Sequence, residues 1–296
     1  MSDATLPTGV GFVGLGRMGD PMVRRLVAGG VQVRAHDAAP VAVKALDGLV
    51  APAESAAAAA DGAAVVILML PDSDVVEAVL DGGLLAALAP GTLLVDMGSS
   101  EPLRTRALAE RVGAHGATLV DAPVSGGVTG ARAGTLAIMV GGPAEAVAGL
   151  APLFELLGRP HHVGEVGAGH ALKALNNLMS AAHLLASSEA ILAGERFGLD
   201  PTVMLDVVNG SSGRSGSTQQ KWPKFIVPET YDSGFSAGLM VKDIRIALRL
   251  TEATGVPSAL AERTVGLWVD AVDELGADAD HTEIARWLRE HTRETA

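Results

Sequence analysis

The sequence predicts an α/β fold, a doubly wound sheet with helices on both faces, followed by an all-α C-terminal domain. Two observations predict it. Short apolar runs alternate with helical patterns through the first half of the chain, which is typical of a parallel sheet with crossover helices. From about residue 169 onward, strand patterns stop and only helical patterns follow. We therefore expect one domain over residues 1–166 and a second over residues 167–296, which begins with a long interdomain helix.

The strands of the first domain are predicted from short apolar runs. Several of these runs show no alternation, as expected for strands that helices cover on both faces. They span residues 9–13, 31–36, 64–70, 92–96, 118–122 and 137–140. Helical patterns lie between or after them, at residues 21–27, 40–46, 55–64, 73–79, 102–112 and 144–157.

The second domain opens with a predicted helix over residues 170–197, which Gly198 and Pro201 bring to an end. The stretch 209–238 is rich in Ser and Gly, and a segment of that length inside a compact domain is functional or partly helical. Further helices fit residues 201–208, 237–254, 258–275 and 282–291.

A glycine-rich turn joins the first predicted strand to the first predicted helix. In Gly14-x-Gly16-x-x-Gly19, the first glycine allows a tight turn and the second lets the backbone approach a pyrophosphate. The third lets the helix pack closely on the strand, and the helix N-terminus presents free N–H groups to the negative charge. The same turn contains Leu15, Arg17 and Met18.

An acidic residue strengthens this interpretation. Asp37 ends the second predicted strand, about 20 residues further on, where a carboxylate binds the ribose hydroxyls of NAD. A glycine-rich turn without this acid could be merely structural. Together they predict a Rossmann-type dinucleotide-binding domain over residues 1–166. Asp37 is followed by Ala38 and Ala39 and not by a basic residue, which favours NAD over NADP, although Arg34 could in principle swing towards a 2′-phosphate.

Composition limits the function classes. The 296-residue chain carries 22 Lys and Arg against 34 Asp and Glu, a formal charge of −12, which argues against nucleic acid and anionic membrane partners. It has no cysteine, so disulfides, thiolate nucleophiles and Cys-ligated metals are excluded. His161 and His162 have no further ligand at metal-binding spacing, so no metal is expected. Residues 1–5 lack the basic segment of a secretory signal, which predicts a cytoplasmic protein.

Lys173 and Asn177 are the first candidates for catalysis. They stand four residues apart at the start of the long predicted helix, so they project from one face, and Ser180 continues that face. The neighbouring positions are apolar, which suggests that Lys173 sits in a cleft with a pKa lowered by desolvation and exchanges a proton near neutral pH. A snorkelling or ion-paired structural lysine is the alternative.

A second candidate site follows the predicted strand at residues 118–122. Ser125, Gly126 and Gly127 lie at the carboxyl edge of the sheet, where open α/β sheets bind ligands. The serine hydroxyl and the glycine N–H groups suit a substrate carboxylate. A plain turn fits the same residues equally well.

Four blocks in order make the chain resemble the β-hydroxyacid dehydrogenase family, and most closely its 3-hydroxyisobutyrate dehydrogenase branch. They are residues 11–19, 121–134, 167–177 and 235–243. The resemblance implies a Rossmann domain, a helical domain, and assembly as a homodimer or homotetramer. It implies that Lys173 is the catalytic lysine, that Asn177 orients the substrate, and that Ser125, Gly126 and Gly127 hold its carboxylate.

The same resemblance implies further contacts. Leu70 and Pro71 would line the ribose and nicotinamide side of the cofactor, Lys242 would reach the cofactor cleft, and Phe235 would cover the nicotinamide. Arg214, in a stretch similar to that branch, would bind substrate.

The chain also departs from the family pattern. The family usually has two hydroxyl residues at the positions of Gly98 and Ser99. In this chain a glycine replaces the first of them, so the resemblance implies that Ser99 takes the role of the second hydroxyl residue in contacting the cofactor. The segment through Lys221, Trp222 and Lys224 diverges and could set a different side-chain preference.

These observations predict an oxidoreductase that transfers a hydride between NAD and a small, 3-hydroxyisobutyrate-like 3-hydroxy acid, with Lys173 as general acid/base. The alternatives are an NADPH-dependent aldehyde or semialdehyde reductase of the same family and a non-catalytic NAD-binding protein. An imine reductase shares this architecture but generally lacks a lysine at position 173.

Overall fold

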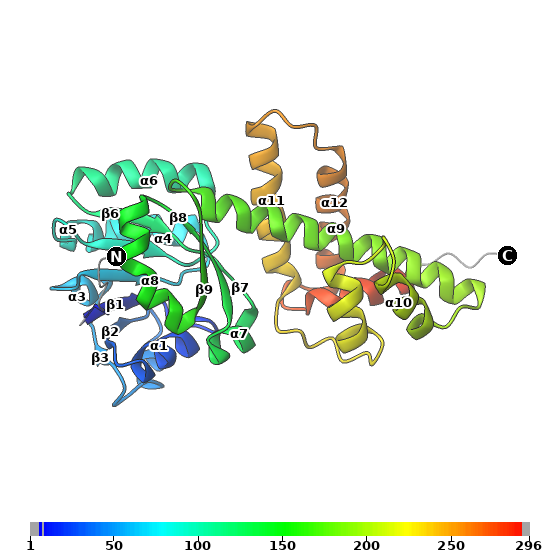
Figure 1. The fold of residues 1–296 in the computed structure, drawn as a ribbon, viewed down its shortest axis with the longest axis horizontal. Coiled ribbons are helices and arrows are strands. Elements are labelled where there is room, and N and C mark those ends of the chain that lie inside the picture. Colours follow the sequence, from blue (N-terminus) through cyan, green and yellow to red (C-terminus); the bar gives the residue numbers. More distant parts are fainter. Residues whose placement is uncertain (1–5, 8, 292–296) are drawn as a thin grey trace. The chain divides into compact units, whose positions relative to one another are not determined.

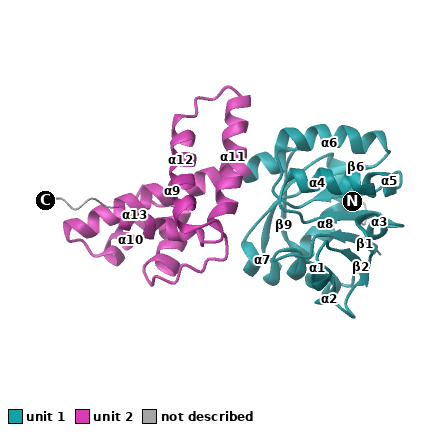
Figure 2. Cartoon of the chain, turned by 180° about the vertical axis from the view of Figure 1, so that it is seen from behind, with its two compact units in different colours: residues 1–173 teal, residues 174–296 magenta. Residues whose placement is uncertain are grey.

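The computed structural model describes residues 6, 7 and 9–291. It comprises two compact units, residues 1–173 and 174–296, shown in different colours in Figure 2. Their boundary lies within helix α9 (Ala168–Phe197), which is continuous through it. Residues 1–5, on which the expectation about a secretory signal rested, lie outside the described residues.

The first unit is built on a mainly parallel sheet (Figure 1). Strands run in the order β3-β2-β1-β4-β5-β6-β8-β7, with β9 paired to β8. Pairings from β3 through to β6 are parallel, whereas β8 is antiparallel to β6 and β7 and parallel to β9. The strands are β1 (Gly9–Val13), β2 (Gln32–His36), β3 (Ala51–Pro52), β4 (Val65–Leu68), β5 (Leu93–Asp96), β6 (Thr118–Asp121), β7 (Val124–Ser125), β8 (Leu136–Gly141) and β9 (Gly158–Gly164).

The strand order explains where a ligand can bind. The chain proceeds from β1 to β2 and β3 on one side, and then to β4, β5 and β6 on the other. The reversal between β1 and β4 is the topological switch point at which open α/β sheets bind ligands, beyond the carboxyl ends of the strands. The glycine-rich turn follows β1 directly at this point.

Helices cover both faces of the sheet, as the apolar strands predicted. Alternate strand residues enter two separate cores: Phe12 packs with α1 and α8 on one face, and Val13 packs with α3, α4 and α6 on the other. The helical segments of this unit are α1 (Gly19–Ala28), α2 (Pro40–Lys44), α3 (Ala56–Ala60), α4 (Ser73–Val79), η1 (Leu80–Leu84), α5 (Leu85–Ala87), α6 (Pro102–Ala114), α7 (Gly127–Ala133) and α8 (Ala144–Leu157).

The second unit is helical around its own core. Trp222 and Trp268 are fully buried there, and Trp287 nearly so. All three tryptophans of the chain and its single tyrosine, Tyr231, belong to this unit. After α9, its segments are α10 (Pro201–Asn209), η2 (Ser217–Ile226), α11 (Ala237–Ala253), α12 (Ala259–Leu275), η3 (His281–Glu283) and α13 (Ile284–Glu290).

The long segment between α10 and α11 is partly helical, as its length predicted. Its centre, η2, is a π-helix of 10 residues that includes Pro223. Such wide turns are rare and usually limited to a single turn. Within the described residues, no helix combines the length and the apolar character needed to cross a membrane.

Candidate active site

The glycine-rich turn has the shape that a dinucleotide requires. An added Cβ would lie 2.4 Å from the Met69 carbonyl oxygen at Gly14, and 1.9 Å from the Gly14 carbonyl oxygen at Gly19, so the chain itself requires both glycines. At Gly16 a Cβ would meet nothing within 4 Å. The space in front of Gly16 is therefore open at the start of α1, where a pyrophosphate can approach the backbone.

Asp37 is tied to this turn. Its Oδ2 accepts a hydrogen bond from the Leu15 N–H at 2.6 Å, and its Oδ1 accepts one from the Ala39 N–H at 2.7 Å. Each carboxylate oxygen has two lone-pair sites, so both can also accept from ribose hydroxyls. The structure thus brings the glycine-rich turn and the predicted ribose-binding acid together.

A cavity of about 500 Å³ opens beside Asp37. Its charged lining consists of Asp37, Asp47 and Glu54 with one lysine, Lys44, so it is mainly acidic. Arg34 does not line this cavity: its Nη1 donates to the carbonyl oxygens of Ala58 and Asp61 and lies 3.8 Å from the Asp61 carboxylate. The other lining residues are His36, Ala38, Pro40, Val43, Val50, Pro52 and Ala53.

On the other side of β1, two turns lie together. Strand β4 ends at Leu68, whereas the sequence predicted a strand over residues 64–70. Leu70 and Pro71 therefore follow the strand by two and three residues instead of lying at its end. A Cβ on Gly98 would stand 2.5 Å from the Leu70 carbonyl oxygen. The backbone at position 98 therefore has no room for the hydroxyl residue of the family pattern. Ser99, next to it, is half-buried.

Ser125, Gly126 and Gly127 lead from a short strand into a helix, and the sequence predicted neither of these two elements. Ser125 ends β7, and α7 begins at Gly127. Gly126 has φ of 132° and Gly127 has φ of 60°, a conformation that favours glycine at both positions. The N–H groups of the first turn of a helix have no partner within it. Their use for a substrate carboxylate stays a prediction.

A buried carboxylate holds the start of α9. Asp121, at the end of β6, accepts hydrogen bonds from the N–H groups of Gly167 at 2.6 Å and His170 at 2.8 Å. Burial raises the pKa of Asp121, while the charge of His170 and these N–H groups act in the opposite direction. His170 is only 1% exposed and shares a hydrogen bond of 2.8 Å with the Thr105 hydroxyl. This clamp fixes the helix that carries Lys173.

Lys173 and Asn177 stand one turn apart on α9. Lys173 is half-buried, and Asn177 is 6% exposed. Within the second unit, the Asn177 side-chain N–H donates to Asp243 Oδ2 at 2.6 Å, and Lys242 Nζ lies 3.3 Å from Asp243 Oδ1. Asp243 therefore links the predicted substrate amide to the predicted cofactor lysine and fixes the orientation of the amide, whose oxygen accepts from the Asn176 side-chain N–H at 3.2 Å.

The two remaining predicted residues also belong to the second unit. Phe235 is half-buried, and its ring meets the His281 ring edge-on at a centroid distance of 5.6 Å. Arg214 is exposed, and its backbone N–H donates to the Ser211 carbonyl oxygen. Within the described part of the chain, neither Phe235 nor Arg214 forms a hydrogen bond with Asn177.

The sequence named Asp121 and Asp243 only as members of motifs and gave neither a role. The sequence signals that could have found them are that Asp121 ends an apolar strand and that Asp243 is adjacent to the candidate Lys242. His162 Nε2 lies 3.0 Å from each of the carbonyl oxygens of Gly142 and Gly164, which accept from it. Among the described residues, no three metal-ligating side chains are grouped together.

Two family models cover the chain. Residues 9–168 match the NAD binding domain of 6-phosphogluconate dehydrogenase, and residues 167–288 match the NAD-binding part of NADP-dependent 3-hydroxyisobutyrate dehydrogenase. The chain is 40% identical to the 3-hydroxyisobutyrate dehydrogenase of Pseudomonas aeruginosa over 291 residues, which cover 93% of this chain and 94% of that protein. The chain belongs to the 3-hydroxyisobutyrate dehydrogenase family.

Other members of the family are similar over most of their length. The 2-(hydroxymethyl)glutarate dehydrogenase of Eubacterium barkeri is 38% identical, with 84% of each chain covered. A solved structure of 3-hydroxyisobutyrate dehydrogenase from Mycobacterium tuberculosis with L-serine has a TM-score of 0.90 at 35% identity, covering 96% of this chain and 100% of that one. The chain is thus an NAD(P)-dependent oxidoreductase, and the expected fold class and reaction class are confirmed.

Proposed function

We propose that this enzyme oxidises small 3-hydroxy acids related to 3-hydroxyisobutyrate, with NAD as the hydride acceptor, and catalyses the reverse reduction. The observation that carries the proposal is on α9, where Lys173 stands one turn before a buried amide that Asp243 holds in place. A lysine and an oriented amide on one face of a helix suit a hydroxyl that must lose its proton.

Lys173 is the general acid/base in this proposal. In oxidation, its neutral amine accepts the hydroxyl proton, and in reduction its ammonium returns that proton to the carbonyl oxygen. NAD, when bound, accepts the hydride from the carbon. Asn177 holds the reacting oxygen against Lys173, and the Asp121 clamp keeps both residues in position through the start of α9.

The substrate carboxylate would bind at Ser125, Gly126 and Gly127. The serine hydroxyl and the N–H groups at the start of α7 suit an anion. A carboxylate held there, with Lys173 at the reacting oxygen, favours a short acid whose hydroxyl is on C3. We assign Arg214 to the substrate as well, on family resemblance alone.

The open space at Gly16 and the Asp37 carboxylate suit NAD. Leu15, Arg17, Met18 and Lys242 would contact its phosphates and ribose, and Leu70, Pro71, Ser99 and Phe235 its nicotinamide side. The acidic lining beside Asp37 would repel a 2′-phosphate, and Arg34 is held by the chain away from it, so we propose NAD in preference to NADP.

At the level of the whole chain, we propose a dinucleotide-binding domain over residues 1–166 and a substrate and oligomerisation domain over residues 167–296. We also propose a cytoplasmic homodimer or homotetramer without nucleic acid or membrane partners, in keeping with the −12 charge and the family resemblance.

A panel of substrates tests the proposal. Purified enzyme is assayed with 3-hydroxyisobutyrate, 3-hydroxypropionate, L-serine and 1-propanol, each with NAD and with NADP. We expect a 3-hydroxy acid with NAD to give the highest kcat/KM and 1-propanol to give no turnover. A kcat/KM for 1-propanol equal to that of the best acid would contradict the carboxylate site. It would favour an alcohol dehydrogenase or a semialdehyde reductase instead. Absence of turnover across the panel would favour a non-catalytic NAD-binding protein.

A further inference from the structure

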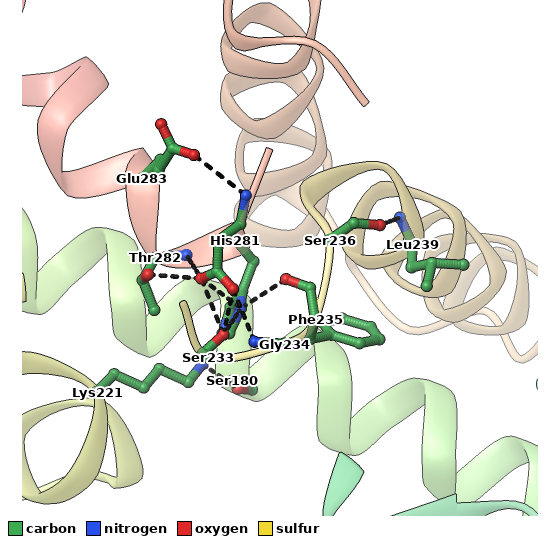
Figure 3. A network of polar contacts seen from close by, with 11 residues as sticks. Ser180, Lys221, Ser233, Gly234, Phe235, Ser236, Leu239, His281, Thr282 and Glu283 are labelled. Atoms are coloured by element: carbon green, nitrogen blue, oxygen red, sulfur yellow. Dashed lines mark hydrogen bonds and ion pairs between the residues drawn. The ribbon is translucent and has the colours of Figure 1, made fainter. Parts of the chain in front are cut away.

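The second unit contains a lysine that the proposed reaction does not use. Lys221, on the π-helix η2, donates a hydrogen bond from Nζ to the Ser180 hydroxyl at 2.8 Å (Figure 3). Both residues are half-buried and keep part of their surface exposed to solvent. An ammonium has three donors, and Ser180 takes one of them.

This ammonium has no ion-pair partner among the described residues. The nearest candidate is Asp280, whose charge does act on Lys221, but the two are not within ion-pair distance. The Asp280 carboxylate already accepts from the Ser233 and Thr282 hydroxyls and from the Gly234 and Thr282 N–H groups, at 2.6–3.0 Å. Those donors fill its acceptor sites.

Burial of an unpaired ammonium is unfavourable, and here it lowers the pKa of Lys221 to about 8, with Asp280 acting in the opposite direction. The neighbouring His281 has a pKa lowered to about 4 by burial, with the charge of Lys221 adding to the effect. Both a π-helical backbone and a buried lysine with a shifted pKa occur frequently at functional sites, and η2 has both.

Ser180 places this charge on the reacting face of α9. Lys173, Asn177 and Ser180 are spaced by four and three residues, so they share one face of the helix. Ser180 lies roughly 10 Å along the axis from Lys173, at 1.5 Å per residue. A substrate held by Lys173 and Asn177 can therefore direct a short substituent along this face towards Lys221.

We infer that Lys221, held by Ser180, is a specificity residue that binds a second anionic group on the substrate, carried by the substituent on C2. The inference rests on the proposed function and deepens it. It assigns the preferred substrate class as 3-hydroxy acids whose C2 substituent ends in a carboxylate, in preference to those with an apolar substituent.

The test compares two acids that differ at one group. In 2-(hydroxymethyl)glutarate the C2 substituent ends in a carboxylate, and in 2-(hydroxymethyl)pentanoate a methyl group takes its place. We expect the wild-type enzyme to prefer the diacid at least tenfold in kcat/KM at pH 7. Lys221→Met should lower kcat/KM for the diacid at least thirtyfold, mainly through KM, and change that for the monoacid less than threefold.

Lys224→Met is the matched control, because Lys224 lies on the same helix but is exposed and bonded to Gln220. It should leave both kcat/KM values unchanged. Equal losses on both acids in Lys221→Met would make Lys221 a structural residue and overturn the inference, as would a wild-type enzyme that does not prefer the diacid.

A second measurement needs no variant. The ratio of the two kcat/KM values, followed from pH 6.5 to 9.5, cancels ionisations that both acids share, including that of Lys173. His281 stays neutral over this range, and Asp280 is the other charged group that faces Lys221. We expect the ratio to fall as Lys221 loses its proton near pH 8, and a constant ratio would contradict the inference. If the enzyme turns over the monoacid and does not prefer the diacid, only the inference about Lys221 is refuted. If it turns over no hydroxy acid at all, the proposed function is refuted as well.

Discussion

At the scale of single residues, the site depends on side chains whose positions are fixed by buried carboxylates. Asp121 holds the backbone at the start of α9, and Asp243, only 2% exposed, holds the Asn177 amide. Neither carboxylate would meet the substrate in the proposed reaction. Each carboxylate instead limits the orientation of a residue that would contact the substrate. In this way the site keeps its geometry before the ligand binds.

Lys173→Met tests the proposed chemistry most directly. We expect kcat to fall at least roughly a thousandfold, because the general acid/base and its positive charge are lost together. Equilibrium titration of NADH fluorescence should show cofactor affinity within about threefold of wild type. A variant that retains a tenth of the wild-type kcat would show that another group transfers the proton.

Cofactor preference is the second test at this scale. Asp37→Ala combined with Ala38→Arg removes the carboxylate that faces the ribose and supplies a cation for a 2′-phosphate. The ratio of kcat/KM with NAD to that with NADP should exceed one in the wild type and shift at least about a hundredfold towards NADP in the double variant. A wild-type preference for NADP would contradict the role given to Asp37 and to the acidic residues beside it.

At the scale of secondary-structure elements, the regular parts of the fold were predictable from the sequence. The expected helices over residues 73–79 and 144–157 and the first strand have the observed bounds, because their apolar pattern and their end signals agree. Strands β3, β7 and β9 were missed. Strands β3 and β7 have two residues each, and β9 carries two exposed histidines, so none of them has an apolar pattern to detect.

The candidate site was predictable only in part, for a similar reason. Motif spacing predicted Gly14, Asp37, Lys173 and Asn177 as site residues, because each of them belongs to a motif that can be recognised locally in the sequence. The Lys221–Ser180 and Asn177–Asp243 pairs join residues 41 and 66 positions apart. Such pairs arise from tertiary packing between helices, and no local pattern encodes them. Helix α7 was missed because its N-cap and its first residue are both glycines, and glycine is a poor helix former.

Gly126→Val tests the β7–α7 turn. Gly126 has φ of 132°, and a Cβ would lie 3.2 Å from Leu136 Cδ2, so a valine strains the backbone and obstructs the turn. We expect at least tenfold lower kcat/KM for 3-hydroxy acids with NADH affinity unchanged. Gly62→Val is the matched control, since Gly62 also has positive φ but a Cβ there meets nothing within 4 Å. Equal effects of the two variants on kcat/KM would mean that strain, and not an anion site, explains the loss.

At the scale of the whole molecule, each unit buries a polar network beside its apolar core. In the nucleotide unit this network surrounds Asp121 and His170, and in the helical unit it surrounds Asp280 and His281. Burial, reinforced by the charge of Lys221, lowers the pKa of His281 from 6.5 to about 4. The folded state thus keeps His281 neutral where an unfolded chain would protonate it.

This difference predicts a loss of stability in mild acid. Between pH 6.5 and 4 the unfolded state binds more protons at His281 than the folded state, so the free energy of unfolding falls as pH falls. The contribution of His281 is on the order of 2 kcal/mol across that window. Thermal unfolding from pH 7 to pH 4.5 should show it, and the slope of Tm against pH should flatten in His281→Asn. An unchanged slope in that variant would assign the acid sensitivity to other groups.

Because Trp222, Trp268 and Trp287 all belong to the helical unit, indole and bound NADH are two distinct optical reporters. Indole emission reports on the helical unit alone, whereas NADH would be held through its pyrophosphate at the glycine-rich turn of the other unit. Indole emission overlaps the absorption of reduced nicotinamide, so energy transfer between them measures the separation of the two units. A stopped-flow trace of that transfer would follow any change in this separation during turnover without an attached dye.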